Sequence, residues 1–210
     1  MCDYSLNRLW WKMSLGQADV SNLEFYPLNG ERWVDFEKLF GKSGACGGCW
    51  CMWWRLTRSE FERQKGEGNR KAIKRIVDSG GVLGILAYAN NQAVAWCSVA
   101  PREAYPTLER SRTLKRVDDK PVWSIVCFFV AKPFRGKGIM SKLLGAAIEY
   151  VSKHGGKIVE AYPVKPKGGR MPAAFAYTGL ASTFQRAGFV DVARHSEKSR
   201  PIMRYVIKGK

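Results

Sequence analysis

The chain has 210 residues, of which 46% are hydrophobic and 25% are charged. This composition is typical of a globular protein of one large or two small domains, and it excludes an intrinsically disordered chain. No run of residues approaches the roughly 18 apolar positions that a membrane-spanning helix needs, and no apolar signal core precedes a cleavage site near the N-terminus. We therefore expect a cytoplasmic protein that does not enter a membrane.

Positive charge is the most unusual feature of the composition. Lysine and arginine number 35 against 18 aspartates and glutamates, which leaves a formal net charge of +17. A field of this sign attracts polyanions such as nucleic acid, an anionic membrane surface or a phosphate-rich cofactor. Net charge alone does not choose among these partners.

The first half of the chain alternates strand and helix patterns. Residues 1–22 show no hydrophobic periodicity, and we expect them to form a loosely ordered extension before a single domain over 23–210, which no repeat or low-complexity linker divides. The expected elements are a strand over 23–28, a helix over 32–40, a helical region that starts after Thr57 or Ser59 and breaks at Gly66 and Gly68, and strands over 82–88 and 92–100 joined by the turn Ala89-Asn90-Asn91.

The second half continues this alternation after a basic loop over 109–120. We expect a continuous apolar strand over 122–130, a helix over 138–153 that ends at Gly155-Gly156, a strand over 157–162, a helix over 172–187, and strands over 189–194 and 202–207. The helix over 138–153 has the clearest pattern because its apolar residues recur at i, i+3 and i+4. The order predicts an α/β layered fold with a mixed sheet.

The turn Arg135-Gly136-Lys137-Gly138 lies between the apolar strand and this clearest helix. Glycine lets a backbone approach a ligand without a Cβ in the way. The first amides of a helix have no partner inside the helix, and its N-terminus carries a partial positive charge. These features, with the two basic side chains, favour a phosphate or pyrophosphate site. A tightly packed strand-to-helix turn explains two glycines equally well.

The segment Arg135-Gly-Lys-Gly138-Ile-Met140 resembles the acetyl-CoA motif Arg/Gln-x-x-Gly-x-Gly/Ala of the GNAT superfamily of N-acyltransferases. The order of elements over roughly 23–207 is also similar, as is Ala187-Gly188-Phe189 to the family's frequent Leu-Gly-Phe. The resemblance implies a single-domain GNAT-like fold, with a mixed, mostly antiparallel sheet flanked by helices. It also implies an N-acetyltransferase in which a primary amine attacks the thioester of acetyl-CoA directly.

The resemblance further implies how acetyl-CoA binds as a co-substrate. Amides of residues 137–141 would hold the pyrophosphate, and the backbone of Phe128 and Val130 would pair with pantetheine like an added strand. The cofactor-binding residues expected on this basis are Phe128, Val130, Arg135, Gly136, Lys137, Gly138, Ile139, Met140 and Ser141.

The sequence departs from the family pattern where proton transfer is concerned. The tyrosine that often protonates the departing thiolate, five residues before the phenylalanine of Leu-Gly-Phe, corresponds here to Phe184, and the frequent cofactor-contacting asparagine corresponds to Tyr177. Met140 stands where the family usually has a small residue. Because a thiolate is a tolerable leaving group near neutral pH, we expect slower or differently assisted transfer.

Three residues are candidates for acid–base catalysis. Glu160 is a candidate general base because it is an acid in an apolar strand next to the expected cofactor strand. A strand carboxylate paired with lysine or arginine is an equally good interpretation. Tyr177 and Ser182 are candidate proton donors, with ordinary hydroxyls on a helix surface as the alternative.

Cysteine and tryptophan are concentrated between residues 44 and 55. Zinc sites normally pair Cys-x-x-Cys with a second ligand couple, which this sequence lacks, so we expect no metal and reduced thiols. Cys97 and Cys127 lie in apolar strands, where a thiol acts as a small hydrophobe. The resemblance places this segment beside the acceptor pocket, whose expected wall is Cys49, Trp50, Cys51, Trp53 and Tyr162. Packing of the same residues in the core is the alternative.

Two other functions remain open at this point. The first is a CoA-binding sensor of the same fold that does not catalyse transfer, which Phe184 and Met140 favour. The second is a nucleic-acid or ribosome-associated protein that uses the basic loops 109–120 and 164–170, although nothing beyond charge supports it. We expect a monomer or homodimer and an acceptor that is acidic or aromatic, but the sequence does not identify it.

Overall fold

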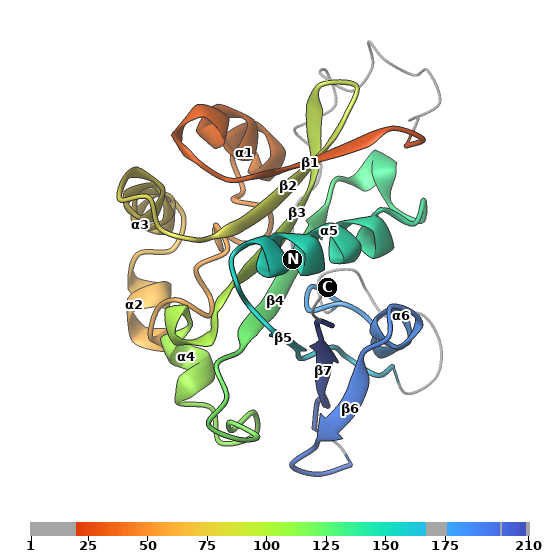
Figure 1. Ribbon diagram of the computed structural model, residues 1–210. Coiled ribbons are helices and arrows are strands. Elements are labelled where there is room, and N and C mark those ends of the chain that lie inside the picture. Colours follow the sequence, from red (N-terminus) through yellow and green to blue (C-terminus); the bar gives the residue numbers. More distant parts are fainter. Residues whose placement is uncertain (1–19, 167–175, 198, 209–210) are drawn as a thin grey trace.

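A seven-stranded sheet in the order β1-β2-β3-β4-β5-β7-β6 organises the computed structural model, which describes residues 20–166, 176–197 and 199–208 (Figure 1). Neighbouring strands are antiparallel except for β4 and β5, which are parallel. The expected mixed, mostly antiparallel sheet is therefore confirmed. The strands are β1 (Leu23–Pro27), β2 (Gly84–Ala89), β3 (Gln92–Pro101), β4 (Trp123–Val130), β5 (Ile158–Ala161), β6 (Val190–Ala193) and β7 (Ile202–Val206).

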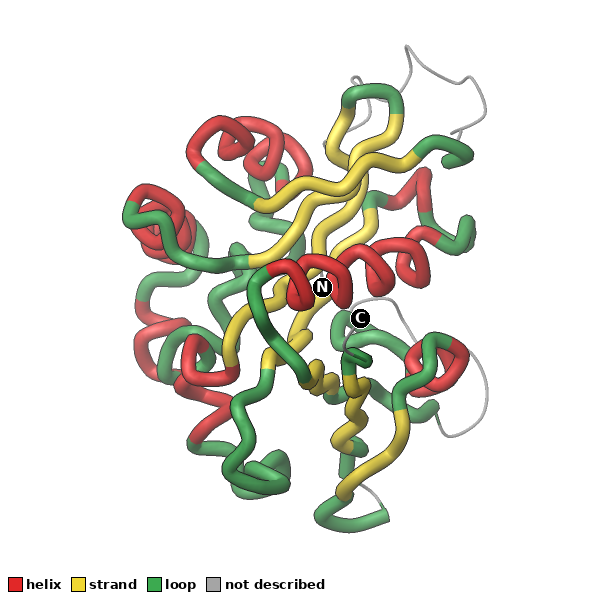
Figure 2. The backbone as a smooth tube through the Cα atoms, in the orientation of Figure 1, coloured by secondary structure: helices red, strands yellow, loops and turns green. Residues whose placement is uncertain are grey.

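Helices cover both faces of this sheet. On β3, the consecutive residues Trp96 and Cys97 point to opposite faces, Trp96 into a core with Phe36 of α1 and Cys97 into a core with Leu143 of α5. Figure 2 shows α5 lying across the strands. The helices are α1 (Trp33–Phe40), α2 (Arg58–Arg63), α3 (Glu67–Asp78), α4 (Pro106–Glu109), α5 (Ile139–Lys153) and α6 (Ala181–Arg186), with 3-10 turns η2 (Gly30–Arg32), η3 (Arg102–Ala104) and η4 (Lys132–Phe134).

A β-bulge interrupts β4 at Val126. The register with β3 passes from Val99 opposite Ile125 to Ser98 opposite Cys127, so that Val126 has no partner of its own. A bulge breaks the strict alternation of side chains. As a result, Ile125 and Phe128 both face the core below α5, whereas Cys127 turns toward the α1 side of the sheet.

Strands β4 and β5 separate soon after they meet. They are paired from Trp123 opposite Val159 to Ile125 opposite Ala161, where β5 ends while β4 continues to Val130. The amide of Ala131 donates to the carbonyl of Val94 at 2.9 Å. Because backbone groups of an antiparallel strand alternate in direction, the N–H and C=O of Phe128 and Val130 point away from β3, toward the side that β5 has left.

Two expected helix boundaries are wrong. The helix expected over 172–187 forms only as α6, because Leu180 makes a parallel bridge with Val164 and Gly179 adopts a left-handed φ of +84°; residues 172–175 lie outside the described residues. The break expected at Gly68 is also absent, since α3 begins at Glu67 and includes Gly68. The other expected elements are present within a few residues of their expected ends.

A capping box at Thr57 marks the end of the segment between α1 and α2 and the start of α2. The Thr57 side chain accepts from the Glu60 amide, and the Glu60 carboxylate accepts from the Thr57 amide at 2.9 Å. We expect Thr57→Ala to lower the free energy of unfolding by about 1 kcal/mol, because it leaves an amide of the first turn without a partner. Urea denaturation measures this, with Ser59→Ala on the exposed first turn as a control that stays within about 0.5 kcal/mol of the parent.

Candidate functional site

The turn before α5 contains backbone amides without a backbone hydrogen-bond acceptor in the described part of the chain, and it has open space at its two glycines. Gly136 and Gly138 have left-handed φ values of +77° and +74°, and no atom lies within 4 Å of where a Cβ would stand at either position. Among the described residues, no backbone carbonyl accepts from the amides of Gly136, Gly138, Ile139 or Met140, whereas the Ser141 amide donates to the Gly138 carbonyl at 3.1 Å. Four amides at or just before the helix N-terminus thus have no backbone acceptor among the described residues.

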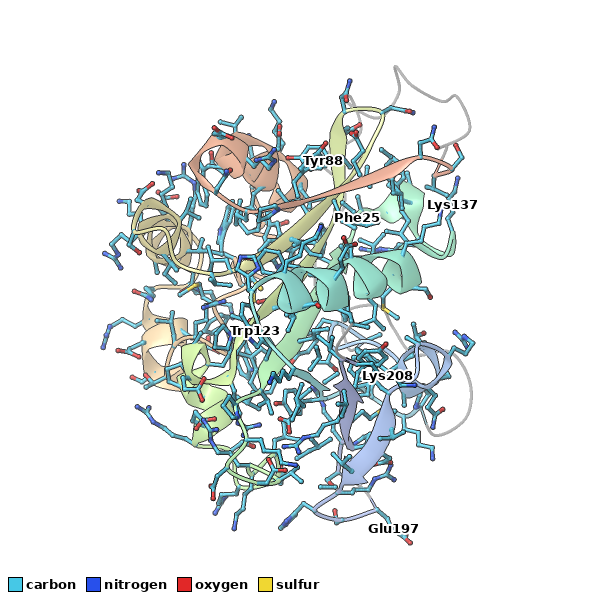
Figure 3. The ribbon with its side chains drawn as sticks, viewed as in Figure 1. Phe25, Tyr88, Trp123, Lys137, Glu197 and Lys208 are labelled. Carbon is cyan, nitrogen blue, oxygen red and sulfur yellow. The ribbon has the colours of Figure 1, made fainter. Side chains whose placement is uncertain are left out.

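The charge around this turn is entirely positive. The sequence from Ala131 to Ile148 contains four basic residues, Lys132, Arg135, Lys137 and Lys142, and no acidic residue. Lys137 lies at the outer edge of the molecule (Figure 3). The Arg135 Nε atom donates to the Val130 carbonyl at 2.8 Å, which ties the turn to the end of β4. With the dipole of a 15-residue helix, this arrangement favours an anion.

The unpaired edge of β4 continues directly from this turn. The Phe128 amide donates to the Tyr177 carbonyl at 2.6 Å, so the residue 176–180 segment occupies one of the backbone positions expected to bind pantetheine. The Val130 carbonyl accepts from Arg135, while its amide points to the same open side. A ligand that pairs with Phe128 must therefore displace the Tyr177 carbonyl.

Glu160 and Tyr162 belong to a buried ionic network. The Glu160 carboxylate accepts from Arg102 at 3.1 Å, from Arg204 Nε at 2.7 Å and from the Tyr162 hydroxyl at 2.8 Å. Both carboxylate oxygens are engaged, and the side chain is 1% exposed. The interpretation of Glu160 as an ion-paired strand carboxylate is confirmed, and so is that of Tyr162 as a packed core tyrosine, which also hydrogen bonds Ser124. In this arrangement Glu160 presents no oxygen to a substrate.

The cysteine and tryptophan segment packs largely as core. Trp50 stacks on Phe40 with ring centroids 5.8 Å apart, and both Trp50 and Cys51 are buried. Cys49 and Trp53 are half-buried, and Trp53 contacts Phe61 edge to face. The alternative in which the loop packs on the core is therefore confirmed for Trp50, and Cys49 and Trp53 are the members with accessible surface.

The cysteine side chains occupy different environments. Cys127 is half-buried among the apolar residues on the α1 side of the sheet, with its thiol 3.8 Å from the Phe128 carbonyl, and Cys97 is fully buried, as expected of thiols that pack as small hydrophobes. Burial raises the pKa of the Cys49 thiol to about 11. Cys46 is disulfide-bonded, which corrects the expectation of reduced thiols at that position.

The candidate proton donors differ in their surroundings. Tyr177 is half-buried below the Arg200 guanidinium, 5.5 Å from its ring centroid, and burial raises the pKa of its phenol. Ser182 is exposed on α6, and Phe184 is fully buried against Phe128 and Phe189. Of these side chains, Tyr177 lies next to the unpaired edge of β4 and keeps its proton at neutral pH.

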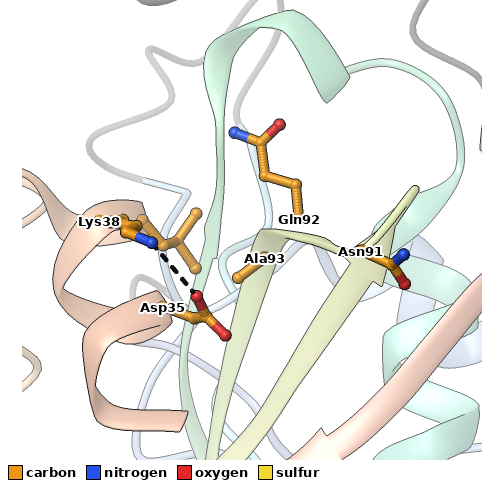
Figure 4. Close-up of a pocket in the computed structure, with 6 residues that line it drawn as sticks. Asp35, Lys38, Asn91, Gln92 and Ala93 are labelled. Atoms are coloured by element: carbon orange, nitrogen blue, oxygen red, sulfur yellow. Dashed lines mark ion pairs between the residues drawn. The ribbon is translucent and has the colours of Figure 1, made fainter.

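A second hollow on the surface lies away from this turn. Figure 4 shows a hollow between α1 and the β2–β3 hairpin in which Lys38 and Asp35 pair at 3.9 Å, and no residue of the turn 135–138 lines it. Across the described residues, no group of three or more histidine, cysteine or acidic side chains is placed to hold a metal ion. No helix in the described part of the chain is long and apolar enough to cross a membrane.

A family model described as "Acetyltransferase (GNAT) family" matches residues 50–168. No curated protein sequence matches significantly.

Solved structures share the fold at low identity. PaiA N-acetyltransferase from Thermoplasma acidophilum in complex with coenzyme A has a TM-score of 0.51 and 14% identity over 89% of this chain and 99% of its own. A GNAT-family acetyltransferase from Streptococcus agalactiae 2603 has a TM-score of 0.54 and 10% identity over 90% and 98%. AAC(6′)-Iy in complex with the bisubstrate analog CoA-S-monomethyl-acetylneamine has a TM-score of 0.53 and 15% identity over 84% and 96%.

The buried network predicts that Glu160 is needed for stability. We expect Glu160→Gln to lower the free energy of unfolding by about 3–5 kcal/mol, because it leaves Arg102 and Arg204 without their shared counter-charge. Chemical denaturation at neutral pH checks this. Glu149→Gln, which removes an exposed pair with Lys153, is the control and should change stability by less than about 1 kcal/mol. A similar small effect at Glu160 would contradict the structural role.

Proposed function

Since the chain belongs to the GNAT acetyltransferase family, we propose that it transfers an acetyl group from acetyl-CoA to a primary amine that attacks the thioester directly. The observation that carries the proposal is that two features adjoin: a basic turn with four amides that have no backbone acceptor in the described residues, and a strand edge, β4 beyond Ile125, that β5 no longer pairs with. A long ligand with a diphosphate at one end and amide groups along its length matches both.

We also propose one domain over residues 23–210, preceded by an extension over 1–22.

In this proposal the turn binds the diphosphate. The amides of Gly136, Gly138, Ile139 and Met140 donate to phosphate oxygens, and Arg135, Lys137 and the helix dipole balance their charge. The Ser141 amide is already bonded within the first turn, so Ser141 contributes its exposed hydroxyl. Glycine at 136 and 138 allows close approach because nothing fills the space on their open side.

The pantetheine arm then follows β4 toward the point where β5 ends. Its amides pair with the backbone of Val130 and Phe128, and the Tyr177 carbonyl gives up its bond to the Phe128 amide. An amide directed at a thioester carbonyl stabilises the oxyanion that forms on attack, and one such donor is typically worth about 3 kcal/mol. Displacement of Tyr177 also brings its phenol, held protonated by burial, near the departing thiolate.

In this proposal the acceptor amine binds on the other face of the sheet, the α1 side, next to the same edge of β4. Cys49 and Trp53 supply the accessible surface there, and Tyr177 and Arg200 border it from the C-terminal part of the chain. A half-buried aromatic surface next to a cation favours an amine that carries an aromatic or acidic portion. Of the residues that the sequence suggested for acid–base catalysis, Tyr177 and Ser182 remain proposed proton donors. The role of Glu160 as general base remains a prediction, and its ion pairs with Arg102 and Arg204 disfavour it.

Binding of CoA tests the proposal. At 100 times its Kd, a ligand specific for the folded state stabilises it by about 2.7 kcal/mol, and thermal unfolding with and without CoA measures this gain. We expect Arg135→Glu to abolish the gain, because it places a negative charge at the phosphate site. Lys71→Glu on the exposed face of α3 makes the same charge change and should leave the gain intact.

Product analysis then separates an enzyme from a sensor. Incubation with acetyl-CoA and a panel of aromatic, acidic and aliphatic primary amines should give an acetylated amine that mass spectrometry detects. CoA binding without any such product would support the sensor. Absence of stabilisation by CoA would contradict the proposed site altogether.

A further inference from the structure

The connection between β6 and β7 (residues 194–201) carries an arginine that contacts the segment 176–180. Arg200 Nη1 donates to the Thr178 hydroxyl at 3.2 Å, and the guanidinium carbon lies 5.5 Å from the centroid of the Tyr177 ring. Thr178 is fully buried, while Arg200 and Tyr177 are half-buried. Two contacts from neighbouring residues therefore hold this cation in place at the surface of the molecule.

Among the described residues, no carboxylate lies within ion-pair distance of Arg200. The other arginines of the β6–β7 hairpin do have such a partner: Arg194 pairs with Asp191 at 2.8 Å, and Arg204 pairs with Glu160 at 2.7 Å. A charge that is partly removed from water costs free energy, and a counter-charge offsets that cost. Arg200 is thus a position where a bound anion can supply the counter-charge.

Arg200 stands beside the edge of β4 at which the proposed transfer takes place. The residue whose ring it covers, Tyr177, accepts from the Phe128 amide through its backbone carbonyl at 2.6 Å. Tyr177 and Trp53 both pack against the apolar cluster that contains Trp54. The guanidinium, the half-buried aromatic surface and the strand edge therefore border one region on the α1 side of the sheet.

The same apolar cluster contains a second hydrogen-bond donor without an acceptor. The indole Nε1 of Trp54 is buried and has no partner among the described residues, and the whole side chain is buried. Buried polar groups in proteins are nearly always paired. The carboxylate of Glu160, which contacts the cluster through Tyr162, is already engaged by Arg102 and Arg204. In the described structure this region therefore has hydrogen-bond donors in excess and no free carboxylate.

A region of this charge selects against cationic acceptors. A primary amine arrives mostly protonated near neutral pH, and its positive charge is repelled by Arg200. A carboxylate on the same molecule balances this charge, and its two oxygens can accept parallel hydrogen bonds from one guanidinium. A phosphate monoester, which carries about −1.5 to −2 charges near neutral pH, exceeds what a single arginine balances.

Building on the proposed function, we infer that the acceptor is a primary amine that carries a carboxylate, and that Arg200 binds this carboxylate and determines the specificity of the enzyme. Trp53 and Tyr177 supply the aromatic surface beside it. The carboxylate does not react, so Arg200 holds it about equally in the ground state and in the transition state. Loss of Arg200 therefore raises KM more than it lowers kcat.

Matched pairs of acids and amides test this assignment. Phenylalanine and phenylalaninamide share their amine and ring and differ in the carboxylate. The pair 4-(aminomethyl)benzoate and 4-(aminomethyl)benzamide places the same difference further from the amine.

With acetyl-CoA, we expect Arg200→Gln to lower kcat/KM for the acid of the preferred pair about 10- to 100-fold more than for its amide. Comparing each substrate between parent and variant cancels the intrinsic difference in amine basicity. Arg200→Lys keeps the charge but not the planar fork and should retain part of the preference. Arg194→Gln removes an arginine from the same connection and is the matched control, in which the ratio of acid to amide should stay at the parent value.

A binding measurement tests the inference without turnover. With CoA in place of acetyl-CoA, the acid should raise the midpoint of thermal unfolding of the parent more than its amide does. Arg200→Gln should abolish this difference while CoA alone still stabilises the variant.

Three results would overturn the inference while leaving the proposed transferase in place. The first is an equal response of the parent to acid and amide, or a preference for the amide. The second is an equal loss for both substrates in Arg200→Gln, which would give Arg200 a purely structural role. The third is loss of stabilisation by CoA in Arg200→Gln, which would assign Arg200 to the co-substrate. Failure of the proposed function has a different signature, the absence of stabilisation of the parent by CoA, and the inference fails with it.

Discussion

The early separation of β4 from β5 is the constraint on which the rest of the site depends. Buried backbone groups need hydrogen-bond partners, and beyond Ile125 the outer edge of β4 has lost those that β5 would supply. The protein satisfies this edge piecemeal, with the Tyr177 carbonyl at Phe128 and the Arg135 guanidinium at Val130. In the proposed function, a ligand that offers amide groups at strand spacing takes the place of these partners along the edge.

The two sides of that edge have different chemistry. Toward α5 lies a basic turn whose amides have no backbone acceptor in the described residues, a combination that favours phosphate. Toward α1 lie a half-buried aromatic and thiol surface and the left-handed backbone of Trp50 and Cys51. The single-residue bulge in β4 determines which side chain faces which side of the sheet. Phe128 packs in the core toward α5, and Cys127 faces the α1 side. A co-substrate and an acceptor that approach from opposite faces would meet at the peptide between these residues.

Local sequence patterns predicted most of the fold because they depend on neighbouring residues alone. The apolar periodicity of α5, the asparagine turn between β2 and β3 and the glycines at 136 and 138 all have the structures that their residue types favour. Apart from the helix break expected at Gly68, the failures involve contacts between distant residues. The bulge at Val126, the bridge from Val164 to Leu180 and the pairing of Glu160 with Arg204 have no signal within a short window. The sequence therefore left Glu160 open between a general base and an ion-paired carboxylate, and it gave no indication of which face Cys127 occupies.

Nuclear magnetic resonance tests most directly whether the amides of the turn before α5 bind the diphosphate of CoA. In a titration of the isotopically labelled protein with CoA, the account predicts that the amide signals of Gly136 and Gly138 move downfield in step with saturation, as amides do when they donate to phosphate. If CoA saturates the protein while these two signals stay in place, the diphosphate binds elsewhere and the account is contradicted.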